Sequence, residues 1–467
     1  MNSYKQRTLK YLVGVLAIGC FCYASLFAAS LKAESRKPNV VVFFTDDQGT
    51  LDVNCYGSKD LYTPNMDKLA ETGVRFTQAY AHTVCCPARA MLMTGRYPQR
   101  SNVNSWTQGN AKEKKKGRNM FRKEVTIAEA LKDAGYKTGI FGKWHLGAHL
   151  DHGPTEQGFD EFTGLRGGFI DNYNHYFLHG KGFHDLYDGK KEIFAKGKYF
   201  PDLITEKALR FLDKNKEVPF FMYVAFNVPH YPEQADSKFD ERYKDMKMPR
   251  QSYAKMISTT DDRMGRIMDR LNQQGIKDNT IIVFMSDNGH SAENYKIQGE
   301  HHSSGLAEGT NYGANGGGGN TGKWLGQKGS FLEGGIRVPA IISYPAKLPK
   351  GIVRDQAVTA MDWMPTILDL CQIELFNVKL DGRSLLDVIK SESTKSLYTD
   401  LYWQWGNDWA VREGDWKLIG SGNEGSSLGH LADPQPEKKN YIKEKPEIAI
   451  RLQALHDEWL KDVQPQH

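Results

Sequence analysis

The chain has 467 residues, of which 40% are hydrophobic and 25% charged, enough for one large domain or a large domain with a smaller one. Its formal charge is +5, but four positive charges lie within residues 1–33, and the remainder carries 57 basic against 56 acidic side chains. A nearly neutral protein gives no global electrostatic reason to bind nucleic acid, which is therefore excluded as an expected partner.

The N-terminal stretch predicts export. Residues 1–33 combine a basic start, an uncharged apolar run over residues 12–27 and small residues at 28–30, the pattern of a cleaved signal peptide. The apolar run is short for a membrane anchor, and no later stretch is apolar enough to cross a bilayer. We therefore expect a periplasmic or secreted mature protein without a transmembrane span. A loose lipoprotein-like motif ending at Cys20 leaves lipid anchoring as an alternative.

Two predicted strands end in oxygen-bearing side chains. Residues 39–45 and 280–285 are short apolar runs, typical of strands buried on both faces. The side chains that follow them are Asp46, Asp47, Asp287 and Asn288. Ligands gather at the carboxyl ends of such strands, and adjacent carboxylates repel each other unless a cation holds them. An acidic turn and an Asn-Gly hairpin are the alternatives, but no alternating partner strand follows Asn288.

A thiol, a proline and a permanent positive charge lie close together in the stretch Cys85-Cys86-Pro87-Ala88-Arg89-Ala90-Met91-Leu92-Met93-Thr94-Gly95-Arg96. If a helix begins here, Cys85 and Arg89 lie one turn apart on the same face. A cysteine at a helix start beside an arginine is biased toward the thiolate, so we expect a reactive Cys85. The alternative is a small buried hydrophobic residue.

Further strands are expected over residues 136–141 and 220–226, and cationic or imidazole side chains follow them. These residues are Lys143, His145 and His230. A long polar loop over residues 290–330 contains Lys328 near its end. Its segment 317–323 imitates a phosphate-binding loop, but Trp324 replaces the required Ser or Thr and no strand precedes it, so that interpretation is rejected.

Helical periodicity alternates with these strands. Helices are expected over residues 66–71, 126–133, 201–214, 253–274 and 359–370. The alternation predicts an α/β fold with a large, mainly parallel sheet and helices on both faces. After residue 395, short antiparallel strands and a terminal helix over residues 446–462 predict a smaller α+β subdomain. The expected division is a signal peptide (1–33), a catalytic α/β domain (34–385) and a C-terminal subdomain (386–467).

Residues 150–200 are rich in Gly, His, Tyr and Phe, and we expect loops with little regular structure there. Aromatic and polar side chains of this kind often line carbohydrate pockets. The candidates in this region are Asp171, Asn172, Asn174 and His175.

The stretch from Cys85 to Arg96 resembles the signature of the formylglycine-dependent type I sulfatases, of the alkaline phosphatase superfamily: Cys-x-Pro-Ser/Ala-Arg followed by Thr-Gly-Arg. In that family a formylglycine-generating or sulfatase-maturating enzyme oxidises the first Cys to Cα-formylglycine (3-oxoalanine). Cys85 matches the modified position, and Ala88 stands where Ser is commoner. The resemblance extends over nearly the whole mature chain, with its motifs in family order.

The resemblance implies a metal site and a set of catalytic groups. The family's divalent cation is usually Ca²⁺, with Mg²⁺ possible here, and its ligands match Asp46, Asp47, Cys85, Asp287 and Asn288. The implied catalytic residues are Cys85, Arg89, Lys143, His145, His230 and Lys328. Two further matches, Glu333 and Arg337, belong to a Glu-Gly-Gly-x-Arg segment that we expect to be structural.

The same resemblance implies a mechanism. One hydroxyl of the hydrated aldehyde attacks sulfur, and the cationic side chains stabilise the charge that develops on the sulfate oxygens. His230, with Lys328 near it, protonates the leaving alcohol. His145 then takes a proton from the second hydroxyl, so that sulfate is eliminated and the aldehyde returns.

The expected function is therefore hydrolysis of a sulfated saccharide by an exported sulfatase, of the bacterial polysaccharide sulfatase type. A phosphonate or phosphate ester hydrolase with the same core is one alternative. A catalytically silent glycan-binding protein, in which Cys85 stays a thiol, is the other. The sequence leaves open the sugar, the sulfated carbon and whether action is at chain ends or inside the chain.

Overall fold

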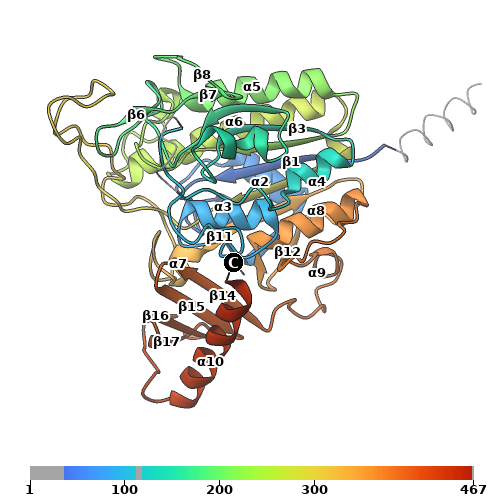
Figure 1. Ribbon diagram of the computed structural model, residues 1–467, viewed down its shortest axis with the longest axis vertical. Helices are drawn as coiled ribbons and strands as arrows, with labels where there is room; N and C mark the ends of the chain where they lie inside the picture. The colour runs from blue at the N-terminus through green and yellow to red at the C-terminus, as the bar shows by residue number, and fades with distance from the viewer. Residues whose placement is uncertain (1–35, 112–117, 465–467) are drawn as a thin grey trace, which may run out of the picture. The chain divides into compact units, whose positions relative to one another are not determined.

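The computed structural model describes residues 36–111 and 118–464 (Figure 1). The described residues from Asn39 onward belong to one unit. The signal peptide expected over residues 1–33, with Cys20, lies outside the described residues. Within the ranges that the structure describes, no helix has both the length and the hydropathy that a membrane crossing requires.

A mixed, mostly parallel sheet of eleven strands forms the centre of this unit, in the order β12-β2-β11-β10-β1-β9-β3-β4-β7-β8 with β13 beside β2. Its main strands are β1 (Asn39–Thr45), β2 (Val74–Tyr80), β3 (Lys137–Lys143), β4 (Glu161–Leu165), β9 (Phe220–Ala225), β10 (Thr280–Ser286) and β11 (Arg337–Ser343). Its short strands are β7 (Tyr187–Asp188), β8 (Lys191–Glu192), β12 (Ile352–Arg354) and β13 (Val358–Thr359). The central strands β10, β1, β9 and β3 run parallel, whereas β11 pairs antiparallel with both β10 and β2.

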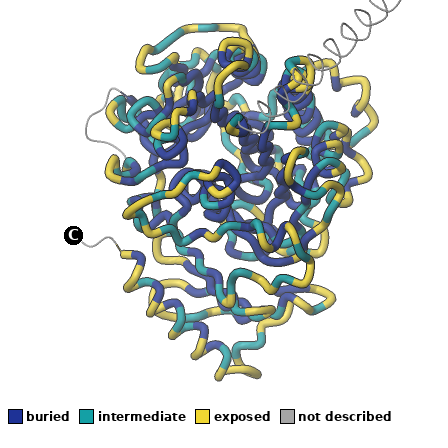
Figure 2. The backbone as a smooth tube through the Cα atoms, turned by 90° about the vertical axis from the view of Figure 1, so that its right-hand side faces the viewer, coloured by how far each residue is buried: buried dark blue, intermediate teal, exposed yellow. Residues whose placement is uncertain are grey.

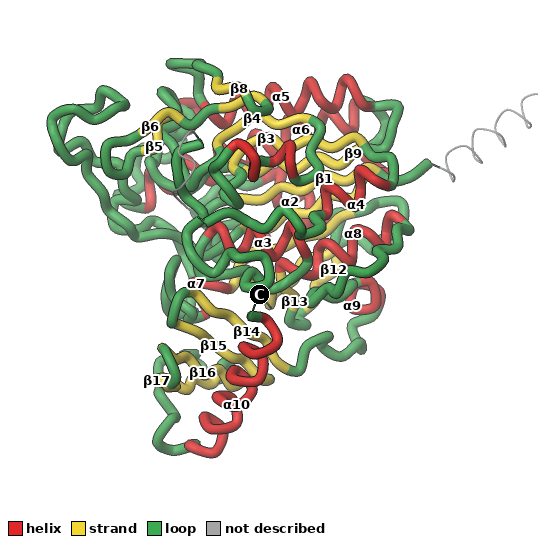
Figure 3. The backbone as a smooth tube through the Cα atoms, in the orientation of Figure 1, coloured by secondary structure: helices red, strands yellow, loops and turns green. Residues whose placement is uncertain are grey.

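Helices cover both faces of the sheet because successive side chains of a strand point to opposite faces. Val40, Val42 and Phe44 of β1 pack in the core on one face, and Val41 and Phe43 pack in the core on the other. The first core contains α3 (Cys85–Thr94), α4 (Ile127–Asp133), α8 (Trp363–Cys371) and α9 (Leu386–Lys390). The second contains α2 (Pro64–Glu71), α5 (Phe200–Asn215) and α6 (Arg250–Gln273). Figures 2 and 3 show the buried strands between these layers, as predicted.

The C-terminal residues form a four-stranded antiparallel sheet in the order β14-β15-β16-β17, packed against a long helix. Its elements are β14 (Asp400–Trp405), β15 (Asp408–Glu413), β16 (Trp416–Ser421), β17 (Glu424–His430) and α10 (Pro446–Val463). The sequence predicts three of these strands, over residues 397–405, 409–412 and 416–419. The fourth, β17, has the polar sequence EGSSLGH and pairs only with β16, so neither propensity nor alternation marks it. The domain boundary at residue 385 stays a prediction.

The expectation of little regular structure over residues 150–200 is wrong in part. β4 lies within this region and pairs parallel with β3 in the main sheet. A hairpin of β5 (Tyr176–Phe177) and β6 (Phe183–His184) and the pair of β7 and β8 follow it. These strands are only two to five residues long, too short to reveal a period.

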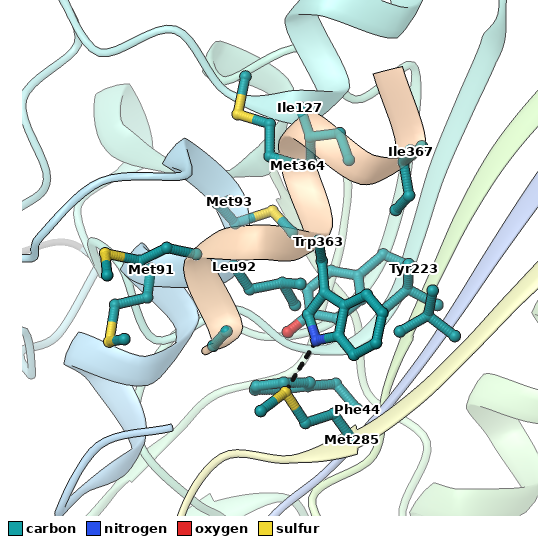
Figure 4. Close-up of a cluster of buried hydrophobic side chains, with 14 of the residues drawn as sticks. Phe44, Met91, Leu92, Met93, Ile127, Tyr223, Met285, Trp363, Met364 and Ile367 are labelled. Carbon is teal, nitrogen blue, oxygen red and sulfur yellow. Dashed lines mark hydrogen bonds between the residues drawn. The ribbon is translucent and has the colours of Figure 1, made fainter. Parts of the chain in front are cut away.

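Trp363 is a central contact of the core between α3, α8 and the sheet (Figure 4). Its side chain is fully buried. Its ring meets Phe76 of β2 edge-on at 5.9 Å, and its Nε1 lies 2.9 Å from the sulfur of Met285 on β10. One side chain therefore joins α8 to two strands of the main sheet.

We expect Trp363→Ala to lower the free energy of unfolding by about 3–5 kcal/mol, because it removes buried surface and leaves a cavity. Denaturant titration followed by circular dichroism measures the change. Phe376→Ala is the matched control, since that ring is 76% exposed. Equal losses in the two variants would contradict this account of the core.

Candidate active site

The carboxyl ends of β1 and β10 bring two acidic pairs together. These strands pair in parallel along their whole length, so Asp46 and Asp47 lie beside Asp287 and Asn288. The Asp47 backbone N–H donates to Asp287 Oδ1 at 3.1 Å, and Asn288 Nδ2 donates to Asp47 Oδ1 at 2.7 Å. Asp47 adopts a φ of 65°, a left-handed conformation that Asp tolerates better than most residues. All four side chains are buried.

Three cationic side chains reach this cluster from three different elements. Arg89 of α3 donates to Asp287 Oδ2 at 2.8 Å. The Lys143 ammonium at the end of β3 lies 2.6 Å from Asp46 Oδ2. Lys328 comes from the long loop, and its ammonium lies 2.9 Å from Asp47 Oδ2. Each carboxylate thus has its own cation.

Burial and mutual charge set the ionisation of this cluster. Burial acts to raise the pKa of Asp46, but the charges of Lys143, His230 and Arg89 outweigh it and hold that pKa below its ordinary value. Burial, together with the negative charge of Asp46, raises the pKa of Asp287. The two carboxyls respond oppositely because charge on one opposes charge on the other.

Cys85 is the first residue of α3, preceded by the extended N-cap Val84. The helix puts Cys85 and Arg89 one turn apart, as predicted, but the expected bias toward the thiolate is wrong. Burial and the negative charge of Asp46 raise the pKa of the Cys85 thiol well above its ordinary value, and Lys143 only partly offsets them. Burial in a dry site opposes charge on sulfur, an effect that local sequence does not reveal.

Two histidines, His145 and His230, line the same pocket as Cys85. His145 adopts a φ of 56°, and neither of its ring nitrogens has a hydrogen-bond partner. Burial and the charge of Lys143 lower its pKa well below the ordinary value. His230 Nε2 lies 3.6 Å from Asp47 Oδ2, and its Nδ1 lies 2.6 Å from the Tyr231 carbonyl oxygen. Burial, with the charge of Lys328, lowers the pKa of His230 to about 4. Both rings are therefore neutral near pH 7.

A pocket of about 280 Å³ opens onto Cys85, His145, His230 and Lys328. The sequence analysis did not identify the other residues that line the pocket, because they come from loops without periodicity. These residues are Trp106, Gln108, Gly168, Phe169, His179, Tyr231, Glu293 and Tyr295. A Cβ at Gly168 would lie 2.5 Å from Gln108 Nε2 and 3.1 Å from the His145 ring, so a larger residue there would displace the Gln108 side chain. The pocket is mostly aromatic, and its charged groups are Glu293 and Lys328.

The four candidates for carbohydrate binding near residue 171 lie outside this pocket. Asp171 accepts hydrogen bonds from three backbone N–H groups of its own turn. Asn172 receives a hydrogen bond from Asn227, and the ring of His175 lies 3.0 Å from the Lys198 carbonyl oxygen. These contacts stabilise the loop itself.

Glu333 and its neighbours form a buried ionic network away from the pocket. Glu333 contacts Lys417 at 2.9 Å and Arg337 at 3.4 Å, and accepts a hydrogen bond from Tyr80 at 2.7 Å. Burial of a charged group is tolerated when such partners are present. The contacts are those of structural support.

The acidic pairs fit a hard divalent cation. Asp46 Oδ1 and Asn288 Oδ1 are buried and have no hydrogen-bond partner, so they are free to bind an ion. Ligand atoms of Asp46, Asp47, Cys85 and His230 lie within 4.8 Å of one another. Carboxylate and amide oxygens are the ligands that Ca²⁺ and Mg²⁺ prefer.

Comparison with known proteins identifies a family. Residues 38–373 match the family model described as Sulfatase, and residues 323–462 match the model described as N-sulphoglucosamine sulphohydrolase, C-terminal. Arylsulfatase J of Mus musculus is 29% identical over 85% of this chain and 66% of its own length. The arylsulfatase of Hemicentrotus pulcherrimus is 32% identical over 83% of this chain and 68% of its own length.

Solved structures have the same fold. Ps i-CgsB in complex with k-i-k-neocarrahexaose is 29% identical, with a TM-score of 0.77, over 92% of this chain and 94% of that one. The phosphonate monoester hydrolase of Agrobacterium radiobacter has a TM-score of 0.64 at 19% identity, over 92% and 95% of the two chains. At that identity the likeness concerns the fold alone.

We expect Ca²⁺ to raise the midpoint of thermal unfolding, because an ion bound only by the folded protein stabilises it, by about 2.7 kcal/mol at a hundred times its Kd. Scanning calorimetry with added Ca²⁺ or a chelator measures the shift. Asp287→Asn should abolish the shift, whereas Asp269→Asn, an exposed position on α6, should retain it. A shift of the same size in both variants would rule out this site.

Proposed function

Because this chain belongs to the sulfatase family, we propose that it is a sulfuric ester hydrolase that removes sulfate from a sulfated saccharide. The observation that carries the proposal is that three cations and two acidic pairs form one buried cluster, next to a pocket lined by Cys85, His230 and Lys328. They come from separate parts of the chain, so their meeting is no consequence of one local motif.

Cys85 is proposed to be converted to formylglycine. Its raised pKa makes the unmodified thiol a poor nucleophile at neutral pH. When formed, the aldehyde would supply, as its hydrate, one hydroxyl to attack sulfur and a second hydroxyl whose loss of a proton re-forms the C=O bond and expels sulfate on the first oxygen. The side chain of residue 85 is only 1% exposed, so we propose that a maturating enzyme acts on the chain before it folds.

The charge of the site suits a sulfate monoester. The site contains four carboxylates and three cationic side chains. The carboxylates belong to Asp46, Asp47, Asp287 and Glu293, and the cations are Arg89, Lys143 and Lys328. With both histidines neutral, these groups sum to one negative charge, and a divalent cation would make the sum one positive charge. We propose Ca²⁺ or Mg²⁺, held by Asp46, Asp47, residue 85, Asp287 and Asn288, which would supply Lewis acidity beside the ester.

The cationic side chains and the histidines have separate proposed roles. Arg89, Lys143 and Lys328 stabilise negative charge on the sulfate oxygens. His230 protonates the leaving alcohol. Its pKa is low in the free protein, but the negative charge of a bound ester raises it. His145, neutral and without a hydrogen-bond partner, accepts the proton released when sulfate leaves.

A saccharide as the leaving group is supported by the pocket and by one relative. The pocket walls are aromatic and polar, without a wholly apolar entry. Ps i-CgsB, 29% identical to this chain, was solved in complex with k-i-k-neocarrahexaose. We also propose export, on the pattern of residues 1–33, and a formylglycine-generating or sulfatase-maturating enzyme as partner.

We expect the protein matured with such an enzyme to contain a residue 85 that has lost its sulfur and reacts with hydroxylamine reagents, as peptide mass spectrometry can establish. Cys85→Ala should lower kcat/KM for a sulfate ester about a thousandfold or more, because the nucleophile is lost. Cys86→Ala is the matched control, since the Cys86 sulfur lies 3.7 Å from the Ser105 carbonyl oxygen and does not line the pocket.

Full desulfating activity in Cys85→Ala would overturn the proposal. An inactive wild-type protein with an intact thiol after maturation would favour the silent glycan-binding alternative. Assays with matched aryl sulfate and aryl phosphonate esters test the remaining alternative, a phosphonate or phosphate ester hydrolase. The sulfatase proposal expects the sulfate ester to be the better substrate, and faster turnover of the phosphonate ester, which is also a monoanion, would contradict it.

A further inference from the structure

Glu293 stands out in the pocket because it is a carboxylate in a site that must bind an anion. Its Oε2 lies 3.1 Å from the Lys328 ammonium, and that ammonium is 2.9 Å from Asp47 Oδ2. Burial acts to raise the pKa of Glu293, but the charges of Lys328 and His230 outweigh it and lower the pKa to about 2. Glu293 is therefore ionised beside the position where the ester binds.

The contacts of Glu293 leave part of the carboxylate available. Oε2 accepts from Ser291 at 3.0 Å in addition to Lys328, and Oε1 accepts from the Tyr295 hydroxyl at 2.8 Å. Two carboxylate oxygens offer about four acceptor positions, so Oε1 can accept a further hydrogen bond. The side chain is 35% exposed and lines the pocket, so a substrate can reach that oxygen.

Pairing with Lys328 does not by itself explain a carboxylate at this position. Lys328 already has Asp47 as a counter-ion, and its ammonium lies 5.4 Å from the centre of the Tyr231 ring. A second carboxylate reduces the positive charge that would attract a sulfate, which is a cost to binding. A second carboxylate is useful where the enzyme must discriminate between substrates that differ in charge.

On the proposed function, we propose that Glu293 is a specificity residue. Its carboxylate accepts a hydrogen bond from a hydroxyl or ammonium group on the sugar carbon next to the one that carries the sulfate ester. It disfavours substrates that carry a second sulfate or a carboxylate on that neighbouring carbon. Because Glu293 contacts Lys328, a substituent adjacent to the sulfate approaches it within a few bond lengths. A second anion at that distance is repelled, whereas a hydroxyl donates.

The walls around Glu293 suit a sugar as the carrier of that hydroxyl. The Trp106 side chain is 42% exposed at the pocket. Its ring stacks on His145 at 6.1 Å and meets Trp405 edge-on at 5.1 Å, so its orientation is held from two sides. A fixed indole ring offers an apolar face on which the C–H face of a sugar ring can pack, while polar groups such as Glu293 form hydrogen bonds with the sugar hydroxyls.

Kinetics on matched pairs of hexose sulfates test this inference. Each pair consists of a monosulfate and the disulfate with its second sulfate on the adjacent carbon, and ion chromatography of released sulfate gives kcat/KM. We expect the wild-type enzyme to prefer the monosulfate. Glu293→Gln should reduce that preference about tenfold, mainly through a lower KM for the disulfate, because one repulsive charge is removed. Glu300→Gln, an exposed position on the same loop, should leave the preference unchanged.

The outcomes are distinguishable. If Glu293→Gln lowers kcat/KM equally for both members of a pair, Glu293 acts only through Lys328 and the inference is wrong. If the variant does not fold, the wild-type ratio decides, since equal turnover of both members or preference for the disulfate overturns the inference. If the matured wild-type enzyme releases sulfate from no pair, the proposed saccharide sulfatase function fails instead.

Discussion

Burial of like charges at one edge of the sheet is the constraint on which the rest of the structure depends. Asp46, Asp47 and Asp287 are all fully buried, and isolated buried carboxylates would cost several kcal/mol each. The fold tolerates them because a cation contacts each one, with N–O distances from 2.6 to 2.9 Å. The ion pairs fix the positions of these charged side chains before a substrate binds. Such preorganisation is what stabilisation of a transition state requires.

The parallel direction of the central strands satisfies that constraint. The acids come from the ends of β1 and β10, and Lys143 comes from the end of β3, which lies on the other side of β9. Only a parallel arrangement points all these carboxyl ends to the same edge. Arg89 reaches the edge from the first turns of α3, and its Nη1 also donates to the Lys143 carbonyl oxygen at 3.1 Å. The helix that begins with Cys85 is thereby tied to β3.

The strands and the acidic pairs were predictable because buried parallel strands are continuous apolar runs with polar side chains directly after them. The placement of Cys85 and Arg89 one turn apart on the same helix was predictable from helical spacing. The pocket walls were not, since Trp106 and Glu293 come from loops whose form depends on tertiary contacts. The ionisation of Cys85 was wrongly predicted because the helix start and Arg89 are visible in the sequence, whereas burial and Asp46 are not.

The C-terminal sheet supports the site through two contacts, although none of its described residues lines the pocket. Trp405, at the end of β14, meets Trp106 edge-on and so orients one pocket wall. Lys417 of β16 is fully buried and pairs with Glu333, which follows Lys328 by five residues. An unpaired buried charge would be costly, so this ion pair holds the end of the long loop in place. The shape of the pocket therefore depends on two sheets, although the groups proposed for the chemistry come from the larger sheet and its loops.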